Sequence, residues 1–129
     1  MAKILLDTHA FLWWMTDSPR LSSAASAALE DRENHLLLSA AVAWELATKV
    51  RIGRLSEAEV ILNDLEGTVS TLGLVPLPVS LAHARLAGSI VNPHRDPFDR
   101  VLVAQSLLED ATLVSADRAL ASFNVSVIW

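Results

Sequence analysis

Cysteine is absent from this sequence of 129 residues. Its absence excludes disulfide bonds, thiolate metal sites and a cysteine nucleophile, and it is typical of a cytoplasmic protein. A membrane-spanning run of about 20 apolar residues is also missing. The best candidate, residues 36–44, is too short and is followed by Glu45. Because Asp7 interrupts the first apolar segment, we expect no signal peptide and no membrane association.

An excess of positive charge is missing as well, since the net charge is −5. This balance counts against a protein that binds nucleic acid through bulk positive charge. It does not exclude a nuclease, because metal ions bound to acidic side chains would cancel part of that charge. The length predicts one domain over residues 1–129, and the hydrophobic content of 52% provides ample core.

Short apolar segments alternate with helical patterns along the whole chain. We predict strands at residues 3–6, 35–39, 74–77, 112–114 and 125–128. We predict helices at residues 9–15, 22–32, 40–52, 56–69, 80–90, 98–108 and 117–122. Ser56 and Glu59 have the spacing of a capping box at the start of one of these helices. The alternation predicts an α/β fold with a parallel sheet covered by helices on both faces.

Four acidic residues lie near the ends of the predicted elements, where such sheets bind their ligands. Asp7 directly follows the first strand, and Asp117 follows the fourth. Glu45 lies on the helix after the second strand, and Asp99 in the first turn of the helix before the fourth. Mg²⁺ and Mn²⁺ prefer carboxylate oxygens, and such an ion activates water and shields the charge of a phosphate. These acids are therefore candidate metal ligands and catalytic residues.

Each of the four acids also has a purely structural interpretation. Asp7 and Asp117 have the residue type and position of helix N-caps. Glu45 is four residues before Lys49, the spacing of a surface ion pair on a helix. Asp99 is an acid in a first helical turn, where the helix dipole favours negative charge. Composition and spacing leave both interpretations open.

Four segments of the chain resemble the PIN-domain nucleases, and more narrowly the VapC toxins of prokaryotic toxin–antitoxin modules. They are KILLDTHAFLWW (3–14), AVAWELATK (41–49), HRDPFDRVLVAQ (94–105) and TLVSAD (112–117). The likeness covers essentially the whole chain, in order and at normal spacing. Its most specific part is the segment Asp-Pro-Phe-Asp-Arg at residues 96–100.

The resemblance implies a three-layer α/β/α fold around a parallel sheet. It implies the toxin of a type II toxin–antitoxin system, a ribonuclease that cleaves RNA phosphodiester bonds with Mg²⁺ or Mn²⁺. A VapB-type antitoxin and a homodimer are the implied protein partners. The family's acids fall on Asp7, Glu45, Asp99 and Asp117, with Ser115 at a position that is usually threonine or serine. In the family, a hairpin like that formed by the helices on either side of Gly53 provides the antitoxin groove.

Several basic and acidic side chains near these acids have two possible roles. Asp96, an extra acid of this subgroup, precedes Pro97 and has the pattern of an N-cap followed by proline at the first helical position. Two interpretations stay open for a set of basic residues, either contact with phosphate or simple exposure to solvent: Lys49, Arg51, Arg54, Arg95, Arg100 and Arg118.

Histidine and tryptophan are not predicted to serve the site directly. His9 and His94 lie near the acids in the sequence, but imidazole suits softer metals than Mg²⁺, which favours other roles for both. Core or interface positions are favoured over base stacking for all the tryptophans: Trp13, Trp14, Trp44 and Trp129. The second helix of the hairpin around Gly53, residues 56–69, has more apolar residues, such as Val60, than one narrow apolar stripe would contain.

Other protein classes fit the sequence less well. A nuclease of the ribonuclease H type needs consecutive β-hairpins between its first two acids, where this chain has the alanine-rich segment 22–32. A receiver domain needs a lysine late in the chain, but the lysines are Lys3 and Lys49. A phosphatase with an Asp-x-Asp pair needs an acid at the position of His9. A catalytically weak PIN domain that serves as a protein-binding module remains an alternative.

Overall fold

The computed structural model describes residues 2–129, in which five parallel strands form one sheet. The strands are β1 (Lys3–Leu6), β2 (His35–Ser39), β3 (Val75–Leu77), β4 (Thr112–Val114) and β5 (Val127–Ile128). The prediction of a parallel sheet is confirmed, with strand bounds close to the predicted ones. This sheet, parallel throughout residues 2–129, also excludes the β-hairpins of a ribonuclease H-type fold.

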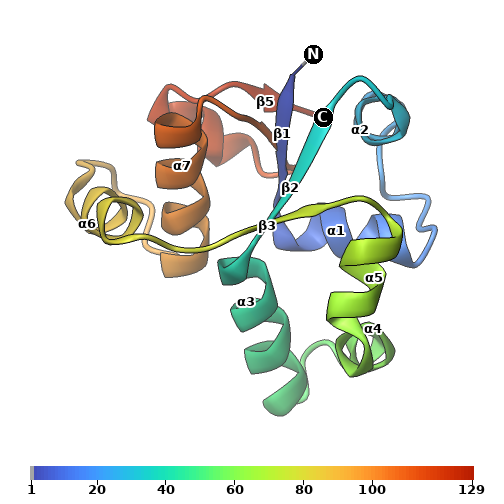
Figure 1. Ribbon diagram of the computed structural model, residues 1–129. Helices are drawn as coiled ribbons and strands as arrows, with labels where there is room; N and C mark the ends of the chain where they lie inside the picture. The colour runs from blue at the N-terminus through green and yellow to red at the C-terminus, as the bar shows by residue number, and fades with distance from the viewer. Residues whose placement is uncertain (1) are drawn as a thin grey trace.

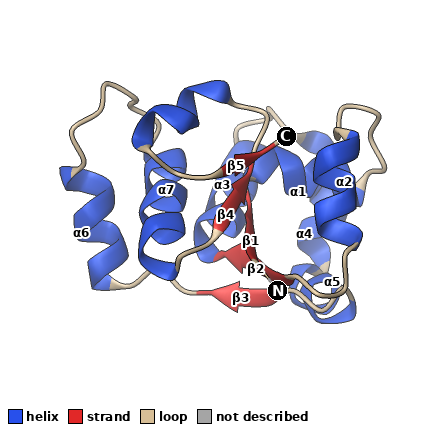
Figure 2. Ribbon diagram, turned by 90° about the horizontal axis from the view of Figure 1, so that it is seen from above, coloured by secondary structure: helices blue, strands red, loops and turns tan. Residues whose placement is uncertain are grey.

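Helices cover both faces of the sheet, which gives the predicted three-layer α/β/α arrangement. Their bounds are α1 (Thr8–Met15), α2 (Ser23–Glu30), α3 (Ala40–Arg51), α4 (Glu59–Asn63), α5 (Leu65–Thr71), α6 (Leu81–Ser89) and α7 (Pro97–Glu109), with 3-10 turns η1 (Ser56–Ala58) and η2 (Arg118–Phe123). α6 and α7 lie on one side of the sheet, and α2, α4 and α5 lie on the other (Figures 1 and 2). Among the helices of residues 2–129, none is long and apolar enough to cross a membrane.

The centre of the core is β1, which pairs with β2 on one side and β4 on the other. Ile4, Leu5 and Leu6 of this strand are at most 1% exposed. A strand covered on both faces needs an uninterrupted apolar run rather than an alternating one, and β1 has such a run. The first polar residue after the run, Asp7, is therefore placed where the strand leaves the core.

One predicted helix is wrong. Instead of a single helix over residues 56–69, the chain forms η1, α4 and α5, with a break at Asp64 (φ −144°, ψ 53°). Leu55 occupies the N-cap position of η1 without a side-chain cap, so the predicted capping box is absent there. At the break, the Asp64 carboxylate lies where a β-carbon on Gly67 would be, so a larger residue at position 67 would have to displace the Asp64 side chain. Local propensity for a continuous helix is thus overridden by the packing of α4 and α5.

The strand order β3-β2-β1-β4-β5 determines where a ligand site can form. The chain passes from β1 to β2 and β3 on one side, and then returns to place β4 on the other side of β1. The connections leave the sheet in opposite directions at this switch, so a ligand site is expected beyond the carboxyl ends of β1 and β4. The N–H of Asp7 donates to the carbonyl of Val114 at 3.0 Å and joins these two ends.

Candidate active site and metal centre

Asp7 lies at the carboxyl end of β1 and is 7% exposed. Its Oδ1 accepts a hydrogen bond from the N–H of Ala10 at 2.8 Å, so it does cap α1 as one interpretation of the sequence had it. A carboxylate can accept through both oxygens, and the cap engages Oδ1. Burial raises the pKa of Asp7, hydrogen bonds from Ser115 and Ala10 oppose this rise, and the charge of Glu45 adds to it. Asp7 is thus a carboxyl group held in an environment that disfavours its charge.

Glu45 lies in the second turn of α3 and is only 3% exposed. Its carboxylate accepts hydrogen bonds from the hydroxyl of Thr8 and from Lys49 Nζ, the latter at 2.5 Å. The predicted pair with Lys49 is present, but the interpretation of Glu45 as a surface residue is wrong. The negative charge of Glu45 raises the pKa of both Asp7 and Asp99. Glu45 therefore interacts with each of these two carboxyl groups.

Asp99 lies in the first turn of α7, and its Oδ2 is 2.9 Å from His94 Nε2. Burial raises the pKa of Asp99 to about 6, and the charges of Asp96 and Glu45 add to this effect. The hydrogen bond from His94 and its charge act in the opposite direction. The interpretation of Asp99 as an ordinary acid at a helix start does not account for its burial among other acids.

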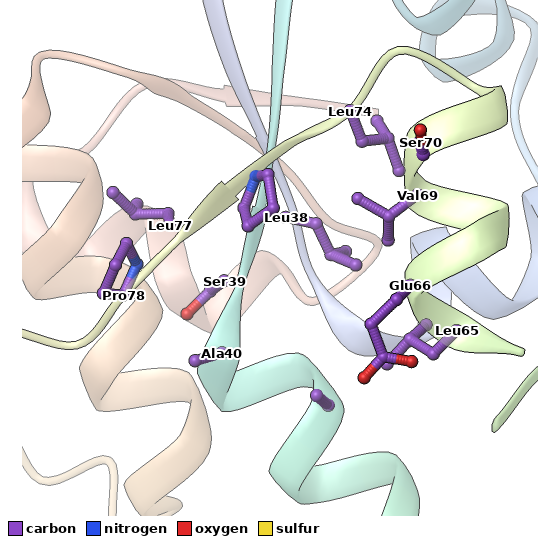
Figure 3. Close-up of a pocket in the computed structure, with 12 residues that line it drawn as sticks. Leu38, Ser39, Ala40, Leu65, Glu66, Val69, Ser70, Leu74, Leu77 and Pro78 are labelled. Carbon is purple, nitrogen blue, oxygen red and sulfur yellow. The ribbon is translucent and has the colours of Figure 1, made fainter.

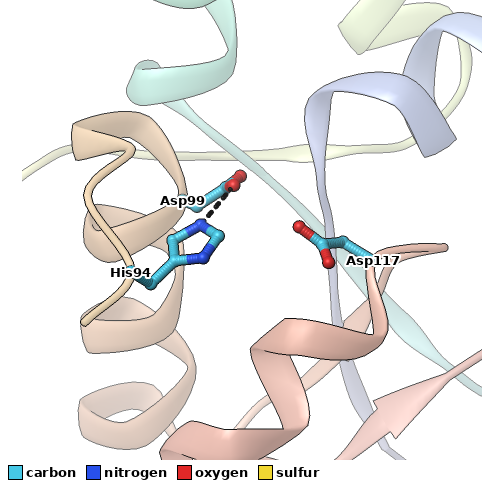
Figure 4. A group of neighbouring side chains, drawn as sticks. All are labelled: His94, Asp99 and Asp117. Carbon is cyan, nitrogen blue, oxygen red and sulfur yellow. Dashed lines mark hydrogen bonds and ion pairs between the residues drawn. The ribbon is translucent and has the colours of Figure 1, made fainter. Parts of the chain in front are cut away.

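Asp117 follows β4 and is the most open member of the set, with an exposed side chain. Its Oδ1 accepts from the N–H of Ala119 at 3.0 Å, so it caps η2, and its own N–H donates to Ser115 Oγ at 3.0 Å. The carboxylate of Asp117 faces the side chains of Asp99 and His94 (Figure 4). One ligand atom from each of these three residues lies within 4.8 Å of the other two.

Two predicted neighbours of the site have structural roles instead. Asp96 Oδ1 accepts from the N–H groups of Phe98 and Asp99, at 2.9 and 3.3 Å, which confirms the predicted N-cap before Pro97. Arg100 was a candidate for a phosphate contact. Its guanidinium instead donates to backbone carbonyls in and around the segment that precedes α7: those of Ala87, Ile90, Asn92 and His94. That candidate role of Arg100 is therefore wrong.

The remaining arginines near the site, Arg51, Arg54, Arg95 and Arg118, are exposed, and phosphate contact stays a prediction for them. Two other side chains were missed or discounted. Thr8, which donates to Glu45, directly follows Asp7 in the sequence, and this adjacency was the available signal. His94 is brought against Asp99 by the turn before α7, a contact that sequence spacing alone did not favour.

The tryptophans are partly buried or exposed, and Trp14 packs against the buried core. The rings of Trp13 and Trp129 are tilted against each other, with centroids 5.6 Å apart. Trp13 is partly buried, and Trp129 is 37% exposed. Trp44 is 61% exposed and meets the edge of Phe98 at a centroid distance of 4.8 Å. A core position is therefore wrong for Trp44, and an interface position remains a prediction.

An apolar cavity of about 540 Å³ lies apart from the acids, on the side of β2 and β3 that α5 covers. Leu65 and Val69 of α5, Leu38 of β2 and Leu77 of β3 line it, and Ala43 of α3 borders it (Figure 3). Val60 on the neighbouring α4 is 79% exposed, which leaves further apolar surface on this helical hairpin. The cavity is formed by β2, α3, α5 and β3 together, so no local sequence pattern indicated it.

An α/β/α fold with a parallel sheet, and acids gathered beyond the ends of β1 and β4, are the features of a PIN domain. Residues 4–125 match the PIN domain family, and the chain belongs to this family.

Among its relatives, Ribonuclease VapC22 from Mycobacterium tuberculosis is 36% identical over 126 residues, which cover 95% of this chain and 92% of that protein. Ribonuclease VapC16 from the same organism is 37% identical over 78 residues, or 55% of each chain. The fold matches that of VapBC2 from Rickettsia felis, solved with a promoter DNA fragment (TM-score 0.67, 17% identity, 97% of this chain and 96% of that chain).

Proposed function

We propose that this protein is a metal-dependent ribonuclease that cleaves RNA phosphodiester bonds and acts as the toxin of a type II toxin–antitoxin system. One observation carries the proposal: hydrogen bonds join Glu45 to Thr8, the residue after Asp7, and join Ser115 to both Asp7 and Asp117, while ligand atoms of Asp117 and Asp99 lie within 4.8 Å of each other. The name and 36% identity of Ribonuclease VapC22 support the choice of RNA as substrate.

The donor set fits a hard divalent cation. Asp7 and Glu45 are buried, and burial of several like charges is unfavourable unless a cation compensates it. Lys49 compensates one of these negative charges by its ion pair with Glu45. We assign Asp7, Glu45, Asp99 and Asp117 as ligands of Mg²⁺ or Mn²⁺, directly or through water, because these ions prefer carboxylate oxygens. When bound, the ion acts as a Lewis acid that lowers the pKa of water and neutralises charge on the phosphate.

The chain's own residues hold the carboxylates in place before a substrate arrives. Thr8 and Lys49 orient Glu45, and Ser115 donates to Asp7 while its hydroxyl accepts from the N–H of Asp117. Such preorganisation lowers the reorganisation that the reaction would otherwise require. These hydroxyls are engaged with the acids, and the sequence has no cysteine, so we assign the nucleophile to water.

We assign the protein partners from the apolar surface of the hairpin that α3 forms with α4 and α5. The apolar cavity between α3, α5 and β3 provides a groove for an apolar segment of a VapB-type antitoxin. The exposed Trp44 and Val60 provide surface for the antitoxin or for a second copy of the chain in a homodimer. The alternative, a catalytically weak PIN domain that only binds proteins, is disfavoured because each of the four acidic positions retains its acid.

Cleavage of labelled RNA in Mg²⁺ tests the proposed activity. We expect Asp7→Asn and Asp99→Asn each to abolish cleavage while the circular dichroism spectrum of the folded protein is kept. Asp17→Asn is a matched control: Asp17 is exposed, and its positive φ of 51° is a conformation that asparagine adopts readily. Full activity in either site variant, or in excess chelator, would reject the assignment. Sequencing the cut ends of total RNA would then identify the substrate.

A further inference from the structure

Figure 4 shows His94, Asp99 and Asp117 side by side, from three different segments of the chain. His94 lies in the loop before α7, Asp99 in its first turn, and Asp117 after β4. His94 Nε2 is 2.9 Å from Asp99 Oδ2. Two neighbouring ligands of an octahedral ion, each about 2.1 Å from it, lie about 3.0 Å apart. The imidazole nitrogen and the carboxylate oxygen therefore already have the separation of two adjacent ligands.

The backbone that carries His94 is held firmly. Arg100 donates to the carbonyls of His94 and Asn92 at 2.8 and 3.1 Å, and the N–H of His94 donates to Asn92 Oδ1 at 2.9 Å. Asn92 in turn donates to Ser122 Oγ at 3.0 Å. The imidazole stands nearly perpendicular to the ring of Phe123, at an interplanar angle of 78° and a centroid distance of 5.9 Å. The His94 side chain would therefore lose little conformational entropy when an ion binds to it.

An imidazole nitrogen from His94, beside the two carboxylates, changes which ions the site prefers. A site of carboxylates alone suits Mg²⁺, whereas an imidazole ligand strengthens binding along the series from Mn²⁺ to Co²⁺ and Ni²⁺. His94 is 19% exposed at its side chain, so it is accessible to an ion from solvent and still partly shielded from water.

We propose that His94 is a direct ligand of the metal centre, together with Asp99 and Asp117, and that it shifts the ion preference from Mg²⁺ toward first-row transition metals. This inference rests on the proposed function, since it concerns the same metal site. The competing role for His94 is positional: its ring N–H would only orient the Asp99 carboxylate by a hydrogen bond, as supporting groups around metal sites do.

The test compares the binding of Co²⁺ and Mg²⁺ to the full chain. His94→Gln keeps an amide N–H that can reach Asp99 but removes the imidazole nitrogen. His9→Gln is the matched control for removing a histidine charge near the acids, because His9 is exposed, its ring contacts Trp13, and its charge acts on Asp7 and not on Asp99. Affinities are measured by calorimetric titration, and the Co²⁺ coordination by its visible absorption spectrum.

We expect His94→Gln to bind Co²⁺ at least about tenfold more weakly, because loss of a direct ligand should cost no less than the loss of a group that only supports a ligand. Its Co²⁺ spectrum should shift, its Mg²⁺ affinity should stay unchanged, and His9→Gln should behave as wild type. Nitrogen hyperfine coupling in the electron paramagnetic resonance of the Mn²⁺-loaded wild type is a second measurement that needs no variant.

A parallel loss of Co²⁺ and Mg²⁺ affinity would assign His94 the positional role and overturn the inference. Unchanged binding of both ions in His94→Gln would also overturn it, while the proposed metal-dependent activity would stand. A wild-type protein that binds neither ion would reject the proposed function itself. Absence of nitrogen coupling in a Mn²⁺-loaded wild type would reject His94 as a ligand even if the variants failed to fold.

Discussion

Replacement of Asp99 by asparagine should stabilise the metal-free protein, although it removes a proposed metal ligand. The side chain of Asp99 is 20% exposed, and burial, followed by the charges of Asp96 and Glu45, raises its pKa to about 6. The amide of asparagine has nearly the same shape and no charge, and its oxygen can still accept a hydrogen bond from His94. The variant therefore removes the unfavourable charge and keeps the contact.

The size of the effect follows from the pKa shift. Asp99 has a pKa of about 6 in the folded state, against the ordinary aspartate value of 3.8. Each pKa unit corresponds to about 1.4 kcal/mol, so the ionised carboxylate destabilises the folded state by about 3 kcal/mol. The weaker hydrogen bond of an amide reduces the gain from the substitution to about 2 kcal/mol. For a domain of this length, that corresponds to an increase of about 8 °C in Tm.

The sign of the pH dependence is also determined. Because the folded-state pKa is raised, the destabilisation is fully present above the folded value of about 6 and disappears as the pH falls toward the unfolded value of 3.8. Thermal melts in chelator at about pH 7.5 should therefore show Asp99→Asn above wild type, with a smaller gap at about pH 4.5. Added Mg²⁺ should raise the Tm of the wild type more than that of the variant. Asp17→Asn again serves as the control for an exposed change of the same kind.

Equal melting temperatures of wild type and Asp99→Asn in chelator at the higher pH would contradict this reasoning. A gap that does not shrink on acidification would do the same, since it would have a cause other than the Asp99 charge. A wild-type Tm that stays flat across a Mg²⁺ titration would count against the clustering of the acids around a cation.

Three further substitutions test the groups that support the site. Asp96→Ala removes the N-cap of α7 and should cost about 1 kcal/mol of stability in urea unfolding, whereas an unchanged midpoint would contradict the capping role. Arg100→Lys cannot reproduce the guanidinium bonds to several carbonyls and should cost about 2 kcal/mol; the exposed Arg95→Lys should have no effect by the same measurement. Thr8→Val keeps the side-chain shape but removes the donor to buried Glu45, so we expect a loss of about 1–3 kcal/mol together with slower RNA cleavage; wild-type stability would show that the bond contributes nothing.

Local pattern was a good guide wherever neighbouring residues decide the conformation. The run Ile4–Leu6 is apolar throughout and forms a buried central strand, and Ser39, Ser80 and Asp96 start helices by capping them. Local pattern failed over residues 56–69, where the Asp64 carboxylate packs across Gly67 and divides the predicted helix. Propensity summed along the chain carries no information about such a contact.

The sequence named candidate acids for the site, but it did not indicate how they are arranged. The order of strands and helices, with the family resemblance, selected Asp7, Glu45, Asp99 and Asp117, and their catalytic roles stay predictions. The sequence did not indicate that Glu45 would be buried against Thr8, that Arg100 would serve the backbone, or that His94 would lie against Asp99. Each of these depends on side chains from separate elements.

By itself, then, the sequence determined most of the helices and strands, the parallel sheet and the identity of the candidate acids, because apolar periodicity and capping act over a few residues. Only the tertiary structure decided the order β3-β2-β1-β4-β5, the burial of Glu45 against Thr8, and the meeting of His94, Asp99 and Asp117. The physical reason is that these placements come from packing between residues far apart in the chain, and the net interaction of buried charges depends on distances that no linear spacing specifies.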